Sequence, residues 1–128
     1  MLDFQFPVSM TFIAICAALM TLMVAYVGLY RGKVKVLRGD GGNAILFKRI
    51  RIHGNFMETA PLTALVMMAA EVAGLGATWL WLAFGSFFLG RVLHFVLFDS
   101  TKRGIAMSLT VFPGFLMGVW ILSRIWGM

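Results

Sequence analysis

The residues able to do chemistry are few in this chain, and they interrupt long apolar stretches. Three are charged and three carry an amide or an imidazole: Glu58, Glu71 and Arg91, with Asn55, His53 and His94. A charge in the middle of a membrane costs about 2.5–3.5 kcal/mol on insertion scales, so charges without an evident structural reason are candidates for function. Cationic and amide donors beside a carboxylate suit the binding of a polar, charged ligand.

The spacing of these residues places most of them on two polar stripes. At about 100° per residue, helical residues three, four and seven apart share one face. One stripe contains Lys48, Arg51, Asn55 and Glu58, and the other contains Arg91, His94, Phe98 and Lys102. Because lipid cannot solvate polar groups, two such stripes on neighbouring antiparallel helices are expected to face each other. We therefore predict an ion pair between Glu58 and Arg91.

Two interpretations of this cluster remain open. It is either a structural clamp between two helices or the lining of a cavity. The donors Arg51, Asn55, Arg91 and His94 accompany a single carboxylate, that of Glu58. This surplus of donors favours a cavity for an anionic polar ligand near the cytoplasmic side. Glu71 lies near the opposite end of its segment, so we interpret it as an interfacial side chain without a further role.

The composition identifies the elements that must position these residues. Of 128 residues, 61% are hydrophobic and 12% charged, and the mean hydropathy is +0.92. Soluble domains are about half apolar and a quarter charged, so this composition excludes disorder, a disulfide-rich secreted module and an ordinary soluble enzyme. A span needs about 20 apolar residues. The chain is therefore expected to be an all-α integral membrane protein, a bundle of four transmembrane helices.

Residues 1–128 are expected to form one membrane domain. The apolar runs predict spans over about 8–30, 55–73, 78–98 and 105–123. Asn43 is a plausible N-cap for a helix that continues through Arg51 into the second span. The glycines of Gly74-Leu75-Gly76 indicate a turn between the second and third spans. A rival topology uses 72–90 as a single span and gives three crossings.

The charges are distributed unevenly along the chain. The formal net charge is +6, and seven basic residues follow the first span: Arg31, Lys33, Lys35, Arg38, Lys48, Arg49 and Arg51. The positive-inside rule places this loop, 31–54, in the cytoplasm and both termini outside, in a multi-pass protein of the inner membrane. The cluster is also suited to attract anionic lipid headgroups or an anionic substrate. Nucleic acid is not an expected partner.

Other chemistry has little support in the sequence. Cys16 lies in an apolar run, where a thiol usually packs as a small hydrophobe. The two histidines lie on different helices without the dense ligand spacing of a metal site, so no metal is expected.

Two segments resemble a known family. Arg51-Ile-His-Gly-Asn55-Phe-Met-Glu58 matches the RxxxNxxE pattern on the second helix of the MAPEG proteins, the membrane-associated proteins in eicosanoid and glutathione metabolism. Gly90-Arg91-Val92-Leu93-His94 is similar to the third-helix segment of that family, which also has an arginine and a histidine three residues apart. The short chain and the loop 39–42 look more like the bacterial branch.

The resemblance implies a homotrimer that binds glutathione as a cosubstrate at subunit interfaces near the cytoplasmic side. By position, Arg51, Asn55 and Glu58 would contact the tripeptide, and Arg91 and His94 would line the same site. A basic residue that ends the first helix also contributes in the family, and here Arg31, Lys33 or Lys35 could serve.

The chain departs from the family where the thiol would be activated. Members similar to prostaglandin E synthase have a tyrosine where this chain has Phe98, and an arginine where it has Met107. Arg103 or Ser108 are the candidates to replace these groups. A cation or a hydroxyl near the sulfur favours the thiolate, which is the reactive form.

The leading hypothesis is a glutathione-dependent transferase or peroxidase that acts on lipophilic electrophiles dissolved in membrane lipid. One alternative is a MAPEG-like protein that binds membrane lipid without catalysis. Another is a small four-helix drug transporter, although such transporters depend on an acidic residue in the first helix, and 8–30 has none.

Overall fold

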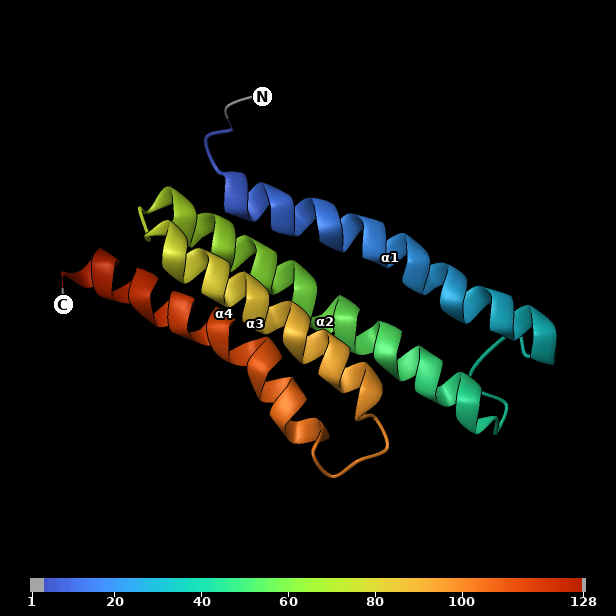
Figure 1. Cartoon of the computed structure of the whole chain (residues 1–128). Coiled ribbons are helices and arrows are strands. Elements are labelled where there is room, and N and C mark those ends of the chain that lie inside the picture. The colour runs from blue at the N-terminus through green and yellow to red at the C-terminus, as the bar shows by residue number, and fades with distance from the viewer. Residues whose placement is uncertain (1–3, 128) are drawn as a thin grey trace.

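The computed structural model describes residues 4–127, which form four helices and no strand. Helix α1 is Pro7–Val34, α2 is Ala44–Val72, α3 is Ala77–Val96 and α4 is Arg103–Trp126. The helices alternate in direction along the chain (Figure 1). The α1–α2 and α3–α4 connections therefore lie at one end of the bundle, and the α2–α3 turn lies at the other.

Local signals set the ends of these helices. Pro7 occupies the first turn of α1, where its missing N–H costs no hydrogen bond. The Asn43 side chain accepts a hydrogen bond from the Leu46 N–H, which confirms the predicted N-cap of α2. Gly74 has a φ of +88° and lies between α2 and α3, so the predicted glycine turn is confirmed and the rival span 72–90 is wrong.

Three of the described helices, α1, α3 and α4, are long and apolar enough to cross a membrane. Helix α2 is as long as these but more polar, because Glu58 and Glu71 fall within its apolar part. The bundle encloses a core of aromatic and aliphatic side chains contributed by all four helices. Phe12 of α1, for example, packs edge-on against Phe87 of α3 with ring centroids 4.9 Å apart.

Glu71 of α2 connects α2 to the start of α1 at the α2–α3 end of the bundle. Its carboxylate accepts hydrogen bonds from the backbone N–H groups of Val8 and Ser9 at 3.1 and 2.8 Å, and from the Ser9 hydroxyl. A carboxylate at a helix N-terminus satisfies free N–H groups and complements the helix dipole. Glu71 of α2 thus caps α1, and the expectation of a merely interfacial side chain is wrong.

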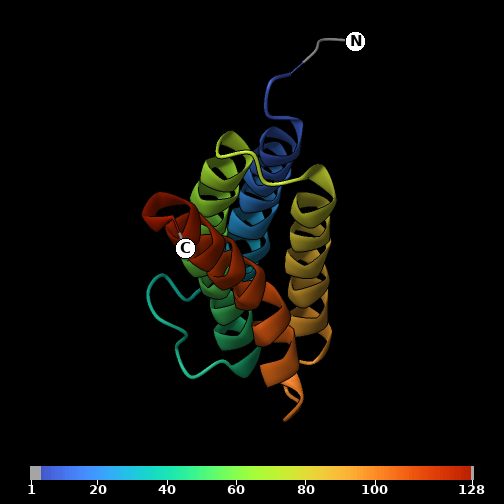
Figure 2. The ribbon, with the colours of Figure 1, turned by 90° about the vertical axis from the view of Figure 1, so that its left-hand side faces the viewer.

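Helix α4 crosses the other helices obliquely and contacts both α2 and α3 (Figure 2). Its interior proline, Pro113, cannot donate to the carbonyl of Leu109. The Ser86 hydroxyl of α3 donates to that carbonyl at 2.8 Å instead. The broken backbone hydrogen bond of α4 is thereby replaced by a bond to α3.

Candidate functional site

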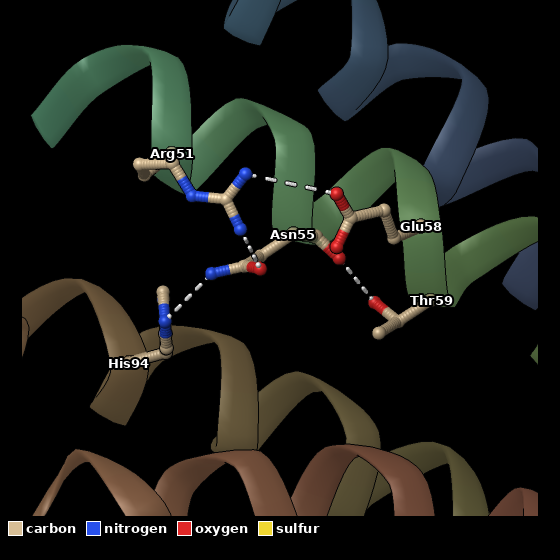
Figure 3. Close-up of polar contacts among 5 residues, drawn as sticks. All are labelled: Arg51, Asn55, Glu58, Thr59 and His94. Carbon is tan, nitrogen blue, oxygen red and sulfur yellow. Dashed lines mark hydrogen bonds and ion pairs between the residues drawn. The ribbon is translucent and has the colours of Figure 1, made fainter. Parts of the chain in front are cut away.

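The polar stripe of α2 is organised by hydrogen bonds along one helix face. Arg51 Nη2 donates to Asn55 Oδ1 at 3.2 Å, and Arg51 Nη1 lies 3.8 Å from Glu58 Oε1 (Figure 3). The Thr59 hydroxyl donates to the Asn55 carbonyl at 2.7 Å. Because the side-chain oxygen of Asn55 faces Arg51, its amide nitrogen is left to reach a neighbouring helix.

That neighbour is His94 of α3, whose Nε2 lies 3.0 Å from Asn55 Nδ2 (Figure 3). Since the amide nitrogen donates, the imidazole accepts at Nε2 and carries its proton on Nδ1. The His94 side chain is buried, and its ring stands edge-on to Phe98, with centroids 5.6 Å apart. The two stripes therefore do meet, through Asn55 and His94.

A cavity of about 510 Å³ opens beside this contact. We call it the polar pocket. It is lined by Phe47, Arg51, Asn55, His94, Phe98, Thr101, Arg103, Gly104 and Met107. Four of the predicted site residues are on this list, and they come from α2, α3 and the first residue of α4. The pocket thus gathers two arginines, an amide and an imidazole.

The connection that closes one side of the pocket is held by an ion pair that the sequence interpretation missed. Lys48 Nζ of α2 lies 2.6 Å from Asp99 Oδ2, and 5.3 Å from the centre of the Phe98 ring. Asp99 lies in the connection between α3 and α4, so this contact ties that connection to α2. The sequence does contain a signal for this ion pair, because Lys48 and Asp99 carry opposite charges in the two polar segments.

The predicted Glu58–Arg91 ion pair is wrong. Within residues 4–127 the ion pairs are Lys48–Asp99 and Arg51–Glu58. Arg91 turns toward α4, where its Nε and Nη2 donate to Thr110 Oγ1 at 3.1 and 2.9 Å. Its Nη2 also lies 3.2 Å from the sulfur of Met107, a residue that lines the polar pocket. Arg91 therefore does not line the polar pocket itself, and it contacts the lining only at Met107.

The close approach of α3 and α4 explains why Arg91 takes this direction. A Cβ atom on Gly90 would collide with Thr110 Oγ1 and would lie 2.7 Å from the Ala106 carbonyl oxygen. The absence of a side chain at Gly90 thus brings the backbone of α4 next to α3. At that separation Thr110 is within reach of Arg91, whereas the Glu58 side chain is 62% exposed on the outer face of α2.

The remaining predicted binding residues lie at the same end but outside the polar pocket. Arg31 Nη1 donates to the carbonyls of Val36 and Gly39 at 3.3 and 2.7 Å, which folds the α1–α2 connection back on α1. Lys35 ends α1 in a left-handed conformation with a φ of +56° and is exposed. Lys33 is exposed on the last turn of α1.

The two candidates for thiol activation lie on different sides of α4. Arg103 lines the polar pocket. The Ser108 hydroxyl donates to the Gly104 carbonyl at 3.0 Å, and Ser108 lines a different cavity.

That second cavity, which we call the apolar groove, has a volume of about 760 Å³ and lies along α3 and α4. It is lined by Leu75, Trp79, Leu82, Ala83, Ser86, Ile105, Ser108, Leu109, Phe112, Pro113, Leu116, Met117 and Trp120. The first two turns of α4 separate it from the polar pocket, with Ile105 on one side and Gly104 on the other.

A cationic side chain that was not singled out from the sequence joins α1 to α2. The Arg49 guanidinium lies 4.2 Å from the ring centre of Tyr26 and 4.3 Å from that of Tyr30, and Nη1 donates to the Tyr26 carbonyl at 2.8 Å. Cation–π contacts of this kind are stronger where water is excluded. Two tyrosines one helical turn apart near a basic segment were the signal for this contact.

The site so far defines a class of protein: an apolar helical bundle with a small polar pocket near one end. The sequence model of the MAPEG family matches residues 9–123. The chain is also 32% identical over 120 residues to the inner membrane protein YecN of Escherichia coli, in strains K12 and O6:H1 CFT073. Those alignments cover 90% of this chain and 88% of each relative. No solved structure matches the chain.

The chain is therefore a membrane protein of the MAPEG family. The bacterial inner membrane relative agrees with the bacterial branch inferred from the length and the loop sequence.

Proposed function

We propose that this protein binds glutathione in the polar pocket and transfers it to lipophilic electrophiles, or uses it to reduce lipid hydroperoxides. The observation that carries this proposal is the shared lining of one cavity by Arg51, Asn55, His94 and Arg103. Glutathione carries two carboxylates and one ammonium, so its site needs several cationic donors. The volume of about 510 Å³ lies within the range of about 300–1,000 Å³ common to small-molecule pockets.

The contacts of the pocket suggest how the tripeptide is held. Arg51 binds a carboxylate, assisted by the amide of Asn55, and Glu58 accepts from the ammonium after releasing Arg51. The Arg51–Glu58 separation of 3.8 Å is long for a charge-assisted hydrogen bond, so this exchange costs little. His94 keeps Asn55 oriented through the contact at 3.0 Å.

Arg103 is the better candidate for thiol activation. It lines the polar pocket, whereas Ser108 faces the apolar groove. A guanidinium near the sulfur stabilises the thiolate while the thiol proton leaves to solvent. The sulfur electron pair then forms a C–S bond to the electrophilic carbon, and the leaving group departs with the pair of its broken bond. In the peroxidase reaction, two glutathiones supply two electrons and yield the disulfide, an alcohol and water.

The apolar groove supplies a route for the second substrate. Its lining is aliphatic and aromatic apart from Ser86 and Ser108, and it reaches the first turns of α4, which also border the polar pocket. A lipophilic electrophile from the bilayer would reach the thiolate around this helix end. Holding both reactants in place converts a bimolecular reaction into an effectively unimolecular one.

The proposal includes an arrangement in the membrane. All four helices cross the bilayer of the inner membrane, with both termini outside and residues 31–54 in the cytoplasm. Three copies form a homotrimer, with glutathione at the subunit interfaces. The exposed Glu58 and the basic end of α1, including Arg31 and Lys35, would then complete the site between subunits, while Arg91 supports it from behind Met107.

Calorimetric titration of detergent-solubilised protein with glutathione tests the binding step. A hydrogen bond to a charged group contributes about 1.5–3 kcal/mol, so Arg51→Ala should weaken glutathione binding at least tenfold. Arg38→Ala is the matched control, because Arg38 is an exposed arginine outside the polar pocket. Absence of binding by the wild-type protein, or equal binding by Arg51→Ala, would refute the proposal.

One observation favours a second candidate, a MAPEG protein that binds glutathione or lipid without catalysis. Phe98 and Met107 line the polar pocket and provide neither a hydroxyl nor a cation for the thiol. Turnover of chlorodinitrobenzene with glutathione separates the two candidates. Activity that is lost in Arg103→Gln and kept in Ser108→Ala supports the enzyme, and binding without turnover supports the second candidate.

A further inference from the structure

The connection between α1 and α2 is a built structure rather than a loose loop. Arg31 donates to two of its carbonyls, those of Val36 and Gly39. The Asp40 side chain accepts from the Gly42 N–H at 3.0 Å, and the Asp40 carbonyl accepts from the Asn43 N–H at 2.9 Å. The conformation of residues 31–43 is therefore set by its own hydrogen bonds.

This conformation turns some side chains inward and others outward. Val36 packs over Gly41, where a Cβ atom would meet Val36 Cγ2 at 2.8 Å. Lys33, Lys35 and Arg38 are exposed, and Leu37 between them is 92% exposed, more than any other large hydrophobic side chain in residues 4–127. A leucine this exposed buries almost no apolar surface within the fold and so does not stabilise it.

The charges around Leu37 are unbalanced. Within the described part of the chain, Lys33, Lys35 and Arg38 form no ion pair, and the carboxylate of Asp40 accepts from the loop backbone. Residues 32–43 also line neither the polar pocket nor the apolar groove. An exposed surface with cations outside any ion pair and one projecting apolar side chain fits an extended anionic interface better than a small soluble anion.

We propose that residues 31–43 form a binding site for anionic lipid headgroups of the adjoining leaflet. Lys33 and Arg38 contact the lipid phosphates, and Leu37 enters the boundary between headgroups and acyl chains. Each basic residue at an anionic membrane surface contributes by charge attraction, and an apolar side chain adds burial. The hydrogen bonds of Arg31 and Asp40 hold these side chains in place before lipid binds.

Binding of fluorescent short-chain phosphatidylglycerol and phosphatidylcholine to protein in a non-ionic detergent tests this site. The wild-type protein should prefer phosphatidylglycerol, and Lys33→Gln/Arg38→Gln should bind it about 30-fold more weakly, as expected for two lost charges. The conservative Lys33→Arg/Arg38→Lys variant should retain the preference. Leu37→Ala should weaken binding of both lipids, whereas Leu29→Ala, changed at another exposed leucine, should leave the binding of both lipids unchanged.

A second double variant at the same end of the bundle separates this site from the glutathione site. Arg51→Gln/Arg103→Gln should lose glutathione binding and keep its phosphatidylglycerol preference. Lys33→Gln/Arg38→Gln should keep glutathione binding and lose the phosphatidylglycerol preference. Equal binding of the two lipids by the wild-type protein would overturn the proposal. So would loss of the preference in both double variants to the same extent, because that result indicates general charge attraction.

Discussion

The two sides of α3 are built in different ways, although both carry residues of one polar stripe. Toward α4 the contact is closed: Gly90 admits the backbone of α4, and Arg91 bonds to Thr110 at 3.1 and 2.9 Å. Toward α2 the contact is open, since Asn55 and His94 meet at 3.0 Å beside the polar pocket. A polar group buried with all its partners stabilises a bundle, whereas one beside a cavity remains available to a ligand.

This difference assigns distinct roles to Arg91 and His94, which lie three residues apart. Arg91 holds α4 against α3 and supports Met107. His94 holds Asn55, whose Oδ1 in turn accepts from Arg51 of the pocket. The closed contact should therefore govern stability and the open contact should govern ligand binding.

The largest effect is expected from Gly90→Ala. The added methyl would lie 2.7 Å from the Ala106 carbonyl oxygen and 2.8 Å from the Thr110 backbone nitrogen, so α3 and α4 would have to separate. Overpacking of this kind costs about 1–3 kcal/mol or more. Thermal unfolding in detergent should show a clearly lower Tm.

The control for this variant is Gly85→Ala on the same helix, where nothing lies within 4 Å of the added methyl. Alanine is the better helix former by about 1 kcal/mol in a helix interior, so the Tm of this variant should stay or rise. Equal Tm values for the two variants would contradict the closed contact.

A smaller loss of stability is expected from Thr110→Val. Valine keeps the shape but removes the acceptor of both Arg91 hydrogen bonds, at a cost of about 2 kcal/mol for bonds to a charged group. Thr110→Ser keeps the acceptor and should unfold nearer to the wild-type Tm. In the control variant Thr63→Val, only the hydrogen bond from the hydroxyl to the Thr59 carbonyl is lost. If its Tm fell as far as that of Thr110→Val, the hydrogen bonds of Arg91 would have no special role.

The smallest effect on stability is expected from Asn55→Ala. The hydrogen bonds to His94 and Arg51 are both lost, but water that enters the cavity can replace them, so the cost is about 1 kcal/mol. Glutathione binding by calorimetry should nevertheless fall at least tenfold, because Arg51 loses its partner. Thr59→Ala, which removes only bonds to carbonyls of its own helix, should leave the binding unchanged.

Features that depend on a few consecutive residues could be predicted from the sequence. The N-cap at Asn43 and the turn at Gly74 follow from local backbone chemistry, and both are confirmed. The helical spacing of Arg51, Asn55 and Glu58 correctly placed these residues along one face of α2 (Figure 3). The family was also recognised from two short segments, and the family match over 9–123 confirms it.

Partners between helices were harder to predict. Helix periodicity placed Arg91 on the same stripe as His94. Periodicity within α3 does not tell how close α4 lies to α3. Glu71 caps α1 at Val8 and Ser9, more than 60 residues away in sequence, so no local pattern announces the contact. The Lys48–Asp99 pair depends on how the α3–α4 connection folds back toward α2.

The sequence by itself determined the N-cap of α2 at Asn43, the turn at Gly74 and the gathering of most basic residues at one end. These properties depend on residues that are neighbours in the chain. Only the tertiary structure decided which polar groups satisfy one another and which line a pocket. Which groups become partners depends on the separation of the helix axes. Between α3 and α4, the missing side chain of Gly90 sets that separation.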